Sequence, residues 1–203
     1  MTALGGLWAH YQHVSAFVLG FHGCDKSVGE AVLNGRKSHL SMSQNDYDWL
    51  GHGIYFWENS PQRAIEFACE AAQTPHLTRG TIKKPFILGA VIDLGLCLNM
   101  TDAMALQEVA DAYDLLTFSF EDERVMPENK LGRRFRDCAV IETLHAYRAH
   151  NNLQPYDSVR GMFVEGTPLY PGAGFNRNDH VQLCVRNASC IKGYFRPIQN
   201  GAQ

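Results

Sequence analysis

The 203-residue sequence lacks long apolar runs, and none of its apolar stretches approaches the roughly 20 residues that a membrane-spanning helix needs. Its N-terminal part also lacks the basic start and the small-residue cleavage site of a secretory signal peptide. We therefore expect a cytoplasmic protein that neither spans nor binds a membrane.

An excess of charge of one sign is also missing. The 18 Lys and Arg residues nearly balance the 21 Asp and Glu residues, which leaves a net charge of -3. Such a small charge provides no overall field that would attract nucleic acid or anionic lipid. A polyanionic partner would have to be held by a local basic patch.

Paired cysteines are absent as well. The six cysteines form no Cys-x-x-Cys motif and no Cys/His spacing typical of a zinc site, so we expect no metal cofactor. Most of them lie in apolar surroundings, where a free cysteine behaves as a small hydrophobic residue. This usage favours a reducing compartment.

The sequence has no internal repeat or low-complexity segment, which favours one domain over residues 1–203. Apolar patterns predict strands at 14–24, 54–57, 86–94, 158–164, 180–187 and 190–195, and helices at 27–33, from 61, from 101 or 102, and at 137–150. The fold class is therefore α+β, with a helical insertion at 100–157. The helix that starts near 101 should pack through Leu106, Val109, Ala110, Tyr113 and Leu116.

The stretch 45–70 is the most informative part of the chain. It is polar until Gly51 and Gly53, which allow the backbone to turn or to approach a ligand, and then runs as a short apolar strand that contains Tyr55. A helix follows, for which Ser60 is the expected N-cap and Pro61 the first residue. The strand places Tyr55 either in a cleft wall or in the core.

A second motif, His22-Gly23, ends the strand expected at 14–24 and precedes a helix. Together with the stretch from Tyr47 to Phe56, it resembles the two N-terminal motifs of the ADP-ribosyltransferases of the diphtheria toxin and poly(ADP-ribose) polymerase type. The resemblance implies antiparallel sheets split around a cleft for NAD, with helices on the outside. It implies that NAD is the co-substrate.

The same resemblance assigns roles to individual residues. His22 would hydrogen-bond the adenosine ribose, and the backbone of Gly23 would hold the nicotinamide carboxamide. Tyr55 would stack on the nicotinamide ring, Phe67 would form the opposite wall, and Gly53 would belong to the NAD-binding loop.

The third motif of the family departs from its pattern here, because Gln182 stands where the resemblance places a catalytic glutamate. Cleavage of the bond between nicotinamide and ribose builds positive charge on the sugar, which a nearby carboxylate stabilises. Glutamine accepts hydrogen bonds but carries no charge and cannot act as a base. Either Gln182 suffices, or Glu165 or Asp179 supplies the carboxylate, and single transfer is expected rather than chain elongation.

A basic cluster bears on which molecule accepts the ADP-ribose. It consists of Lys130, Arg133, Arg134 and Arg136. It is either a solvated surface or a phosphate-binding patch. The second interpretation makes a nucleic acid the acceptor, with RNA ahead of DNA or protein. A transferase acting inside its own cell would resemble the toxin of a toxin-antitoxin or antiphage system, with a neutralising antitoxin or immunity partner.

The sequence is also compatible with three other functions. The missing glutamate suits a non-catalytic module that binds NAD or ADP-ribose. An NAD-dependent RNA phosphotransferase shares the expected fold, and an interaction domain without a ligand is the simplest alternative.

Overall fold

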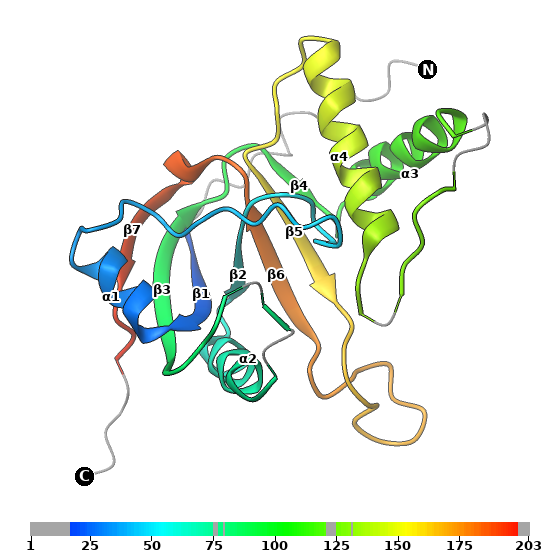
Figure 1. Ribbon diagram of the computed structural model, residues 1–203. Coiled ribbons are helices and arrows are strands. Elements are labelled where there is room, and N and C mark those ends of the chain that lie inside the picture. Colours follow the sequence, from blue (N-terminus) through cyan, green and yellow to red (C-terminus); the bar gives the residue numbers. More distant parts are fainter. Residues whose placement is uncertain (1–16, 75–76, 79, 121–124, 131, 199–203) are drawn as a thin grey trace.

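The structure is a computed structural model and describes residues 17–74, 77–78, 80–120, 125–130 and 132–198. A seven-stranded sheet and four helices make up the described part (Figure 1), and this confirms the expected α+β class. The strands are β1 (Phe17–Asp25), β2 (Ile54–Glu58), β3 (Pro85–Asp93), β4 (Cys97–Asn99), β5 (Ser158–Phe163), β6 (His180–Val185) and β7 (Ile191–Phe195). The helices are α1 (Lys26–Leu33), α2 (Pro61–Gln73), α3 (Ala103–Phe118) and α4 (Phe135–His150). Residues 14–16 of the first expected strand lie outside the described residues.

The strands follow the order β4-β5-β6-β2-β1-β3-β7, and every pair is antiparallel except β4 with β5. β1 pairs with β3 along its whole length, from Phe17 to Asp25. Its pairing with β2 is limited to Gly20 with Glu58 and Phe21 with Trp57. The described strands thus form one continuous sheet and not the split sheets that the resemblance implied, and the pairing of β1 with β2, next to His22, is the shortest in it.

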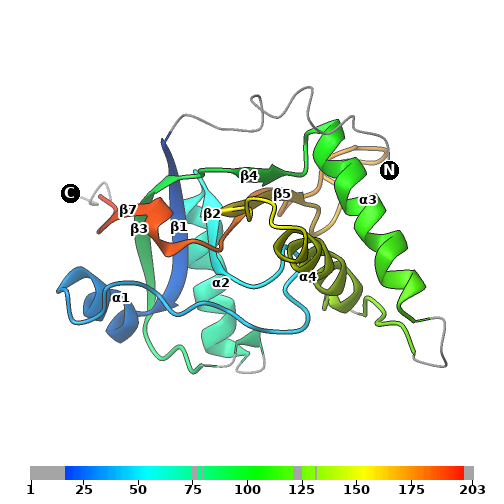
Figure 2. The same ribbon diagram turned by 90° about the horizontal axis from the view of Figure 1, so that it is seen from above.

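The helices are distributed over both faces of the sheet. On one face, α1 packs over β1 and β3, where Val32 joins Phe56, Leu88 and Ile92 in a buried cluster. On the other face, α2 packs against Phe21 and Trp57, and α3 and α4 pack over Leu98 and Val159. Figure 2 shows the sheet as bent, with α2 and α4 on its inner side and α1 outside.

Two positions require glycine, because neighbouring atoms lie too close to the backbone to leave room for a Cβ. A Cβ on Gly23 would lie 2.1 Å from the carbonyl oxygen of Ala64 in α2, and a Cβ on Gly53 would lie 2.5 Å from Sγ of Cys184 in β6. Both glycines belong to the motifs that the sequence identified. They bring α2 and the loop before β2 directly against the strands.

Two local predictions are only partly right. Ser60 is the N-cap of α2 and Pro61 begins the helix, but the side chain of Ser60 makes no capping hydrogen bond. In α3, Val109 and Leu116 pack against the core as predicted, whereas Leu106, Ala110 and Tyr113 are exposed and the helix buries Ala105 and Ala112 in their place. The reason is that small residues allow α3 to lie close to its neighbours, whereas the predicted stripe weighted large side chains. Among the described helices, none is long and apolar enough to cross a membrane.

Candidate functional site

The residues of the three motifs lie on three neighbouring strands, because β6, β2 and β1 are adjacent in the sheet. His22 lies just beyond the last β1–β2 pair, where its Nδ1 is 2.7 Å from the carbonyl oxygen of Tyr55. A carbonyl only accepts, so Nδ1–H donates, and the side chain of His22 joins the two strands where their backbones no longer pair. Burial lowers the pKa of His22, so the ring is neutral and its Nε2 carries a lone pair.

Tyr55 is held by the loop that precedes β2. Its hydroxyl donates to the carbonyl oxygen of Gly51 over 2.7 Å and accepts the N–H of Leu50 over 3.1 Å. Burial raises the pKa of Tyr55 well above its usual value, so the phenol stays protonated. The half-buried ring packs with the cluster under α3 and α4. Phe67, expected to face Tyr55, lies against Trp57 instead, with ring centroids 5.0 Å apart.

Gln182 lies on the same face of the sheet as Trp57, because the two are paired across β6 and β2. On its other side Gln182 is paired with Gly161 of β5. Trp49 covers that glycine and donates the hydrogen bond from Nε1 to Oε1 of Gln182. The glutamine oxygen is thus oriented by an indole N–H.

Aromatic rings continue on both sides of Gln182 and form what we call the aromatic row. Its members in spatial order are Trp49, Phe163, His180, Trp57 and Phe67, with successive centroids 5.0, 5.5, 6.0 and 5.0 Å apart. They come from five segments: the loop before β2, the strands β5, β6 and β2, and the helix α2. The row gives this face of the sheet a set of flat surfaces next to Gln182.

The two carboxylates considered for the glutamate role have different surroundings. Glu165 accepts a hydrogen bond from Arg63 of α2 over 2.9 Å, and its Oε2 lies 3.8 Å from Nδ1 of His180 in the aromatic row. Asp179 accepts the N–H groups of Glu165 and Asn176, which close the loop between β5 and β6. These hydrogen bonds lower the pKa of Asp179. Glu165 therefore lies at the aromatic row, whereas Asp179 is used to shape the loop.

Three polar atoms at the aromatic row are buried without a hydrogen-bond partner among the described residues. They are Nε1 of Trp57, Nε of Arg63 and Nε2 of His180. Buried polar atoms are nearly always paired in folded proteins, so each such atom calls for an explanation. A bound water or a polar group of a ligand at these rings would satisfy them.

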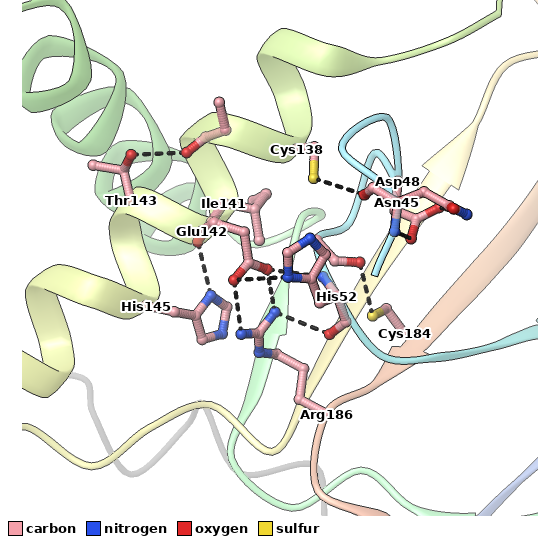
Figure 3. A network of polar contacts seen from close by, with 12 residues as sticks. Asn45, Asp48, His52, Cys138, Ile141, Glu142, Thr143, His145, Cys184 and Arg186 are labelled. Carbon is pink, nitrogen blue, oxygen red and sulfur yellow. Dashed lines mark hydrogen bonds and ion pairs between the residues drawn. The ribbon is translucent and has the colours of Figure 1, made fainter. Parts of the chain in front are cut away.

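An ion pair between α4 and the residue after β6 holds the loop that carries Trp49 and Gly51. Glu142 of α4 binds Arg186, which follows β6, through two contacts of 2.5 and 3.1 Å. The same carboxylate accepts the N–H of His52, and Arg186 donates to the carbonyl oxygen of His52 (Figure 3). Gly51 adopts φ +77°, and a Cβ there would lie 2.5 Å from the Glu142 carboxylate. This clamp positions the loop and does not reach the aromatic row.

The basic cluster divides into two parts. The guanidinium of Arg134 lies 5.7 Å from the ring centroid of Phe163, and that of Arg133 lies 5.1 Å from the ring of Tyr47. Arg136 instead donates to the carbonyl oxygen of Pro127. The side chain of Lys130 is 70% exposed, and its Nζ is 3.9 Å from Glu128. Arg133 and Arg134 thus stand next to aromatic rings, whereas Arg136 serves the local fold.

Sequence reasoning placed His22, Tyr55 and Gln182 on strands, but it did not predict that these strands are neighbours, and it missed most of the aromatic row. The overlooked residues are four members of the row, Trp49, Trp57, Phe163 and His180, and the adjacent Arg63. Alternation within the strands was a usable signal, since it places Tyr55 with Trp57 and His180 with Gln182 on common faces. Arg63 gave no such signal, because it lies on a helix face with other polar residues.

Comparisons with protein-family models, with curated proteins and with solved structures found no match to this chain.

Proposed function

We propose that the protein is a mono-ADP-ribosyltransferase that uses NAD as its co-substrate. The observation that carries this proposal is the interrupted pairing of β1 with β2 at His22-Gly23, the motif whose resemblance to the family first suggested NAD. Beyond Phe21, the edge of β1 has no strand partner on the β2 side. An unpaired strand edge offers both N–H and C=O groups, the combination that a carboxamide requires.

His22 and Tyr55 would act beside this edge. The neutral His22 ring donates through Nδ1 to Tyr55, so its Nε2 is left to accept a hydrogen bond from a ribose hydroxyl. Tyr55 would present its half-buried ring to nicotinamide while its hydroxyl holds the preceding loop. Gly53 would allow that loop to lie close to NAD.

The reaction would break the bond between nicotinamide and C1′ of the ribose. Gln182 would hydrogen-bond the nicotinamide ribose through its amide, with its oxygen oriented by Trp49. The negative charge that the sugar cation requires would come from Glu165, because this carboxylate lies at the aromatic row and Asp179 is engaged in the loop. Such preorganised electrostatic partners account for about 3 to 4 kcal/mol in other enzymes.

The acceptor in this proposal is RNA, ahead of DNA or protein. Single-stranded nucleic acids are held by aromatic rings on which bases stack and by nearby arginines. Arg134 over Phe163 joins the basic cluster to the aromatic row and so combines both features. A transferase acting on the RNA of its own cell also calls for a neutralising antitoxin or immunity partner.

Transfer of label from NAD carrying ³²P in its adenylate tests this proposal. The purified protein is incubated with labelled NAD and, in separate reactions, with RNA, with DNA and with protein from a cell extract. We expect label on RNA that is sensitive to ribonuclease and is reduced with His22→Ala. Label on none of the three acceptors, with NAD left intact, would refute the proposed activity.

A second candidate is a module that binds NAD or ADP-ribose without turnover. It is favoured by Gln182, which lacks charge and whose oxygen already accepts the Trp49 hydrogen bond. Saturable NAD binding without release of nicotinamide would select this function over transfer.

A further inference from the structure

His180 is a buried histidine with one ring nitrogen in use and the other without a partner. Its side chain is 4% exposed, and the ring lies between those of Trp57 and Phe163. Nε2 is buried and makes no hydrogen bond to any described residue. His180 also precedes Gln182 by two residues on β6, so both side chains project from the same face of the sheet.

The hydrogen bond on the far side of the ring determines which nitrogen carries the proton. Nδ1 lies 2.7 Å from the carbonyl oxygen of Asn178, and because a carbonyl cannot donate, Nδ1–H is the donor. Burial lowers the pKa of His180 despite this hydrogen bond and the nearby Glu165, so the ring is neutral. Nε2 is therefore the basic nitrogen of the ring.

We propose that His180 is the general base of the transfer reaction and accepts the proton of the attacking hydroxyl. This inference rests on the proposed function, in which Gln182 cannot act as a base. The two groups at the aromatic row that are able to take up a proton are Glu165 and His180. Glu165 is already engaged in an ion pair with Arg63, whereas Nε2 of His180 has no partner among the described residues.

In the proposed step, the bond that forms at the ribose replaces the bond that breaks there. The bond between C1′ of the ribose and N1 of the nicotinamide breaks, and nicotinamide leaves as a neutral molecule with the bonding electron pair. The oxygen of the acceptor hydroxyl, or of water in the absence of an acceptor, forms the new bond to C1′. Its proton moves to Nε2 of His180 and is later released to solvent.

In addition to supplying negative charge near the sugar, Glu165 positions His180 in this scheme. Its Oε2 lies 3.8 Å from Nδ1 of His180 and would stabilise the imidazolium that forms when Nε2 is protonated. Arg63 holds Glu165 in place through the 2.9 Å contact. The charged groups that act on His180 are thus Arg63 from α2, Glu165 after β5 and the adjacent Asp179.

The arrangement of a base with its second nitrogen held by a carbonyl and a carboxylate is a general one in enzymes that activate hydroxyl groups. Removal of such a base lowers turnover by about 100-fold to 10,000-fold. A structural histidine at this position would instead affect folding alone. A general base makes turnover depend on pH through its own pKa, whereas a structural histidine does not.

The test is the rate of nicotinamide release by the full chain with NAD and water as acceptor, measured from pH 4.5 to 9. For the wild type, we expect kcat to rise with pH through a pKa below 6.5 and then to level off. His180→Gln should lose that rise and at least 100-fold in kcat, with unchanged NAD affinity and thermal unfolding. Glu165→Gln should move the rise to lower pH, because loss of the negative charge lowers the pKa of His180.

The exposed His150 at the end of α4 provides the matched control, and His150→Gln should behave as the wild type. A wild-type profile without the acid limb, or a folded His180→Gln variant that keeps it, would overturn the role of His180 while leaving the proposed function intact. Should His180→Gln fail to fold, the wild-type profile and its shift in Glu165→Gln decide the matter. Absence of any nicotinamide release by the wild type would overturn the proposed activity itself.

Discussion

The imidazole of His22 donates from Nδ1 to the carbonyl oxygen of Tyr55, and this bond joins β1 and β2 where their backbone pairing has ended. A side chain thus holds the two strands together while the strand edge at Gly23 stays unpaired. In the proposed function this junction receives the nicotinamide end of NAD. The first two predictions concern the two residues that form it.

Replacing His22 with alanine removes both the bridge to Tyr55 and the proposed bond from Nε2 to a ribose hydroxyl. A hydrogen bond contributes about 1 kcal/mol, so the dissociation constant for NAD should rise about fivefold to tenfold. Calorimetric titration with NAD measures it, with His150→Ala as the control. An unchanged dissociation constant in a folded variant would place NAD elsewhere or exclude its binding.

Tyr55 offers a test that separates its ring from its hydroxyl. Tyr55→Phe keeps the ring but leaves Gly51 and Leu50 without their partner, which should cost about 1 to 3 kcal/mol of stability with little change in NAD affinity. Tyr55→Ala should additionally weaken NAD binding, since an aromatic stack contributes about 0.5 to 1.5 kcal/mol. Denaturant unfolding and NAD titration measure the two effects. Equal NAD affinity in both variants would make Tyr55 a core residue.

The substitution Gln182→Glu restores the charge that the family motif carries. We expect faster NAD hydrolysis, because a carboxylate next to the sugar stabilises its positive charge, and slower transfer to the acceptor. Gln182→Ala should lower both rates. Nicotinamide release and acceptor labelling, measured together, provide the readout. If neither variant changes either rate, Gln182 does not lie at the reacting centre.

The clamp formed by Glu142 and Arg186 should stabilise the protein in a pH-dependent manner. Although burial alone would raise the pKa of Glu142, the hydrogen bonds from Arg186 and from the N–H of His52 lower it overall. A lowered folded-state pKa means that the stabilisation is present above the usual value near 4.5 and disappears as the pH falls through the folded-state pKa. Glu142→Gln should therefore lower stability at pH 7, by about 2 kcal/mol for a half-buried pair, and much less at pH 3.

Urea unfolding of the wild type and of Glu142→Gln at both pH values measures this difference. Glu128→Gln is a suitable control, because the side chain of Glu128 is 61% exposed and its ion pair with Lys130 is long. Equal destabilisation by Glu142→Gln at pH 3 and pH 7 would mean that packing, and not the charge, holds the loop.

The basic cluster makes a prediction for nucleic-acid binding. Arg133→Ala and Arg134→Ala should weaken binding of single-stranded RNA and reduce the slope of log K against log salt by about 0.7 per lost phosphate contact. Arg136→Ala should change the slope little, because its guanidinium is used by Pro127. Fluorescence anisotropy with a labelled oligonucleotide, between 50 and 300 mM salt in about five steps, follows the slope. If the slope of log K against log salt is the same in Arg133→Ala and Arg134→Ala as in the wild type, the acceptor is not a nucleic acid held by these arginines.

The sequence predicted most strand and helix positions because alternation and helical periodicity are local signals. It could not predict that Phe67 lies against Trp57, since that contact depends on how α2 crosses the sheet. Phe163, His180 and Trp49 meet only through the pairing of β5 with β6 and the path of the loop before β2. The register between distant strands decides such contacts, and local alternation within each strand does not reveal it.

Release of nicotinamide from NAD by the purified protein tests the central claim most directly. With NAD below its dissociation constant, we predict a protein-dependent release that is linear in protein concentration and reduced about fivefold to tenfold in His22→Ala. The same rate in samples with and without protein, together with no detectable NAD binding, would contradict the assignment of an NAD-dependent transferase.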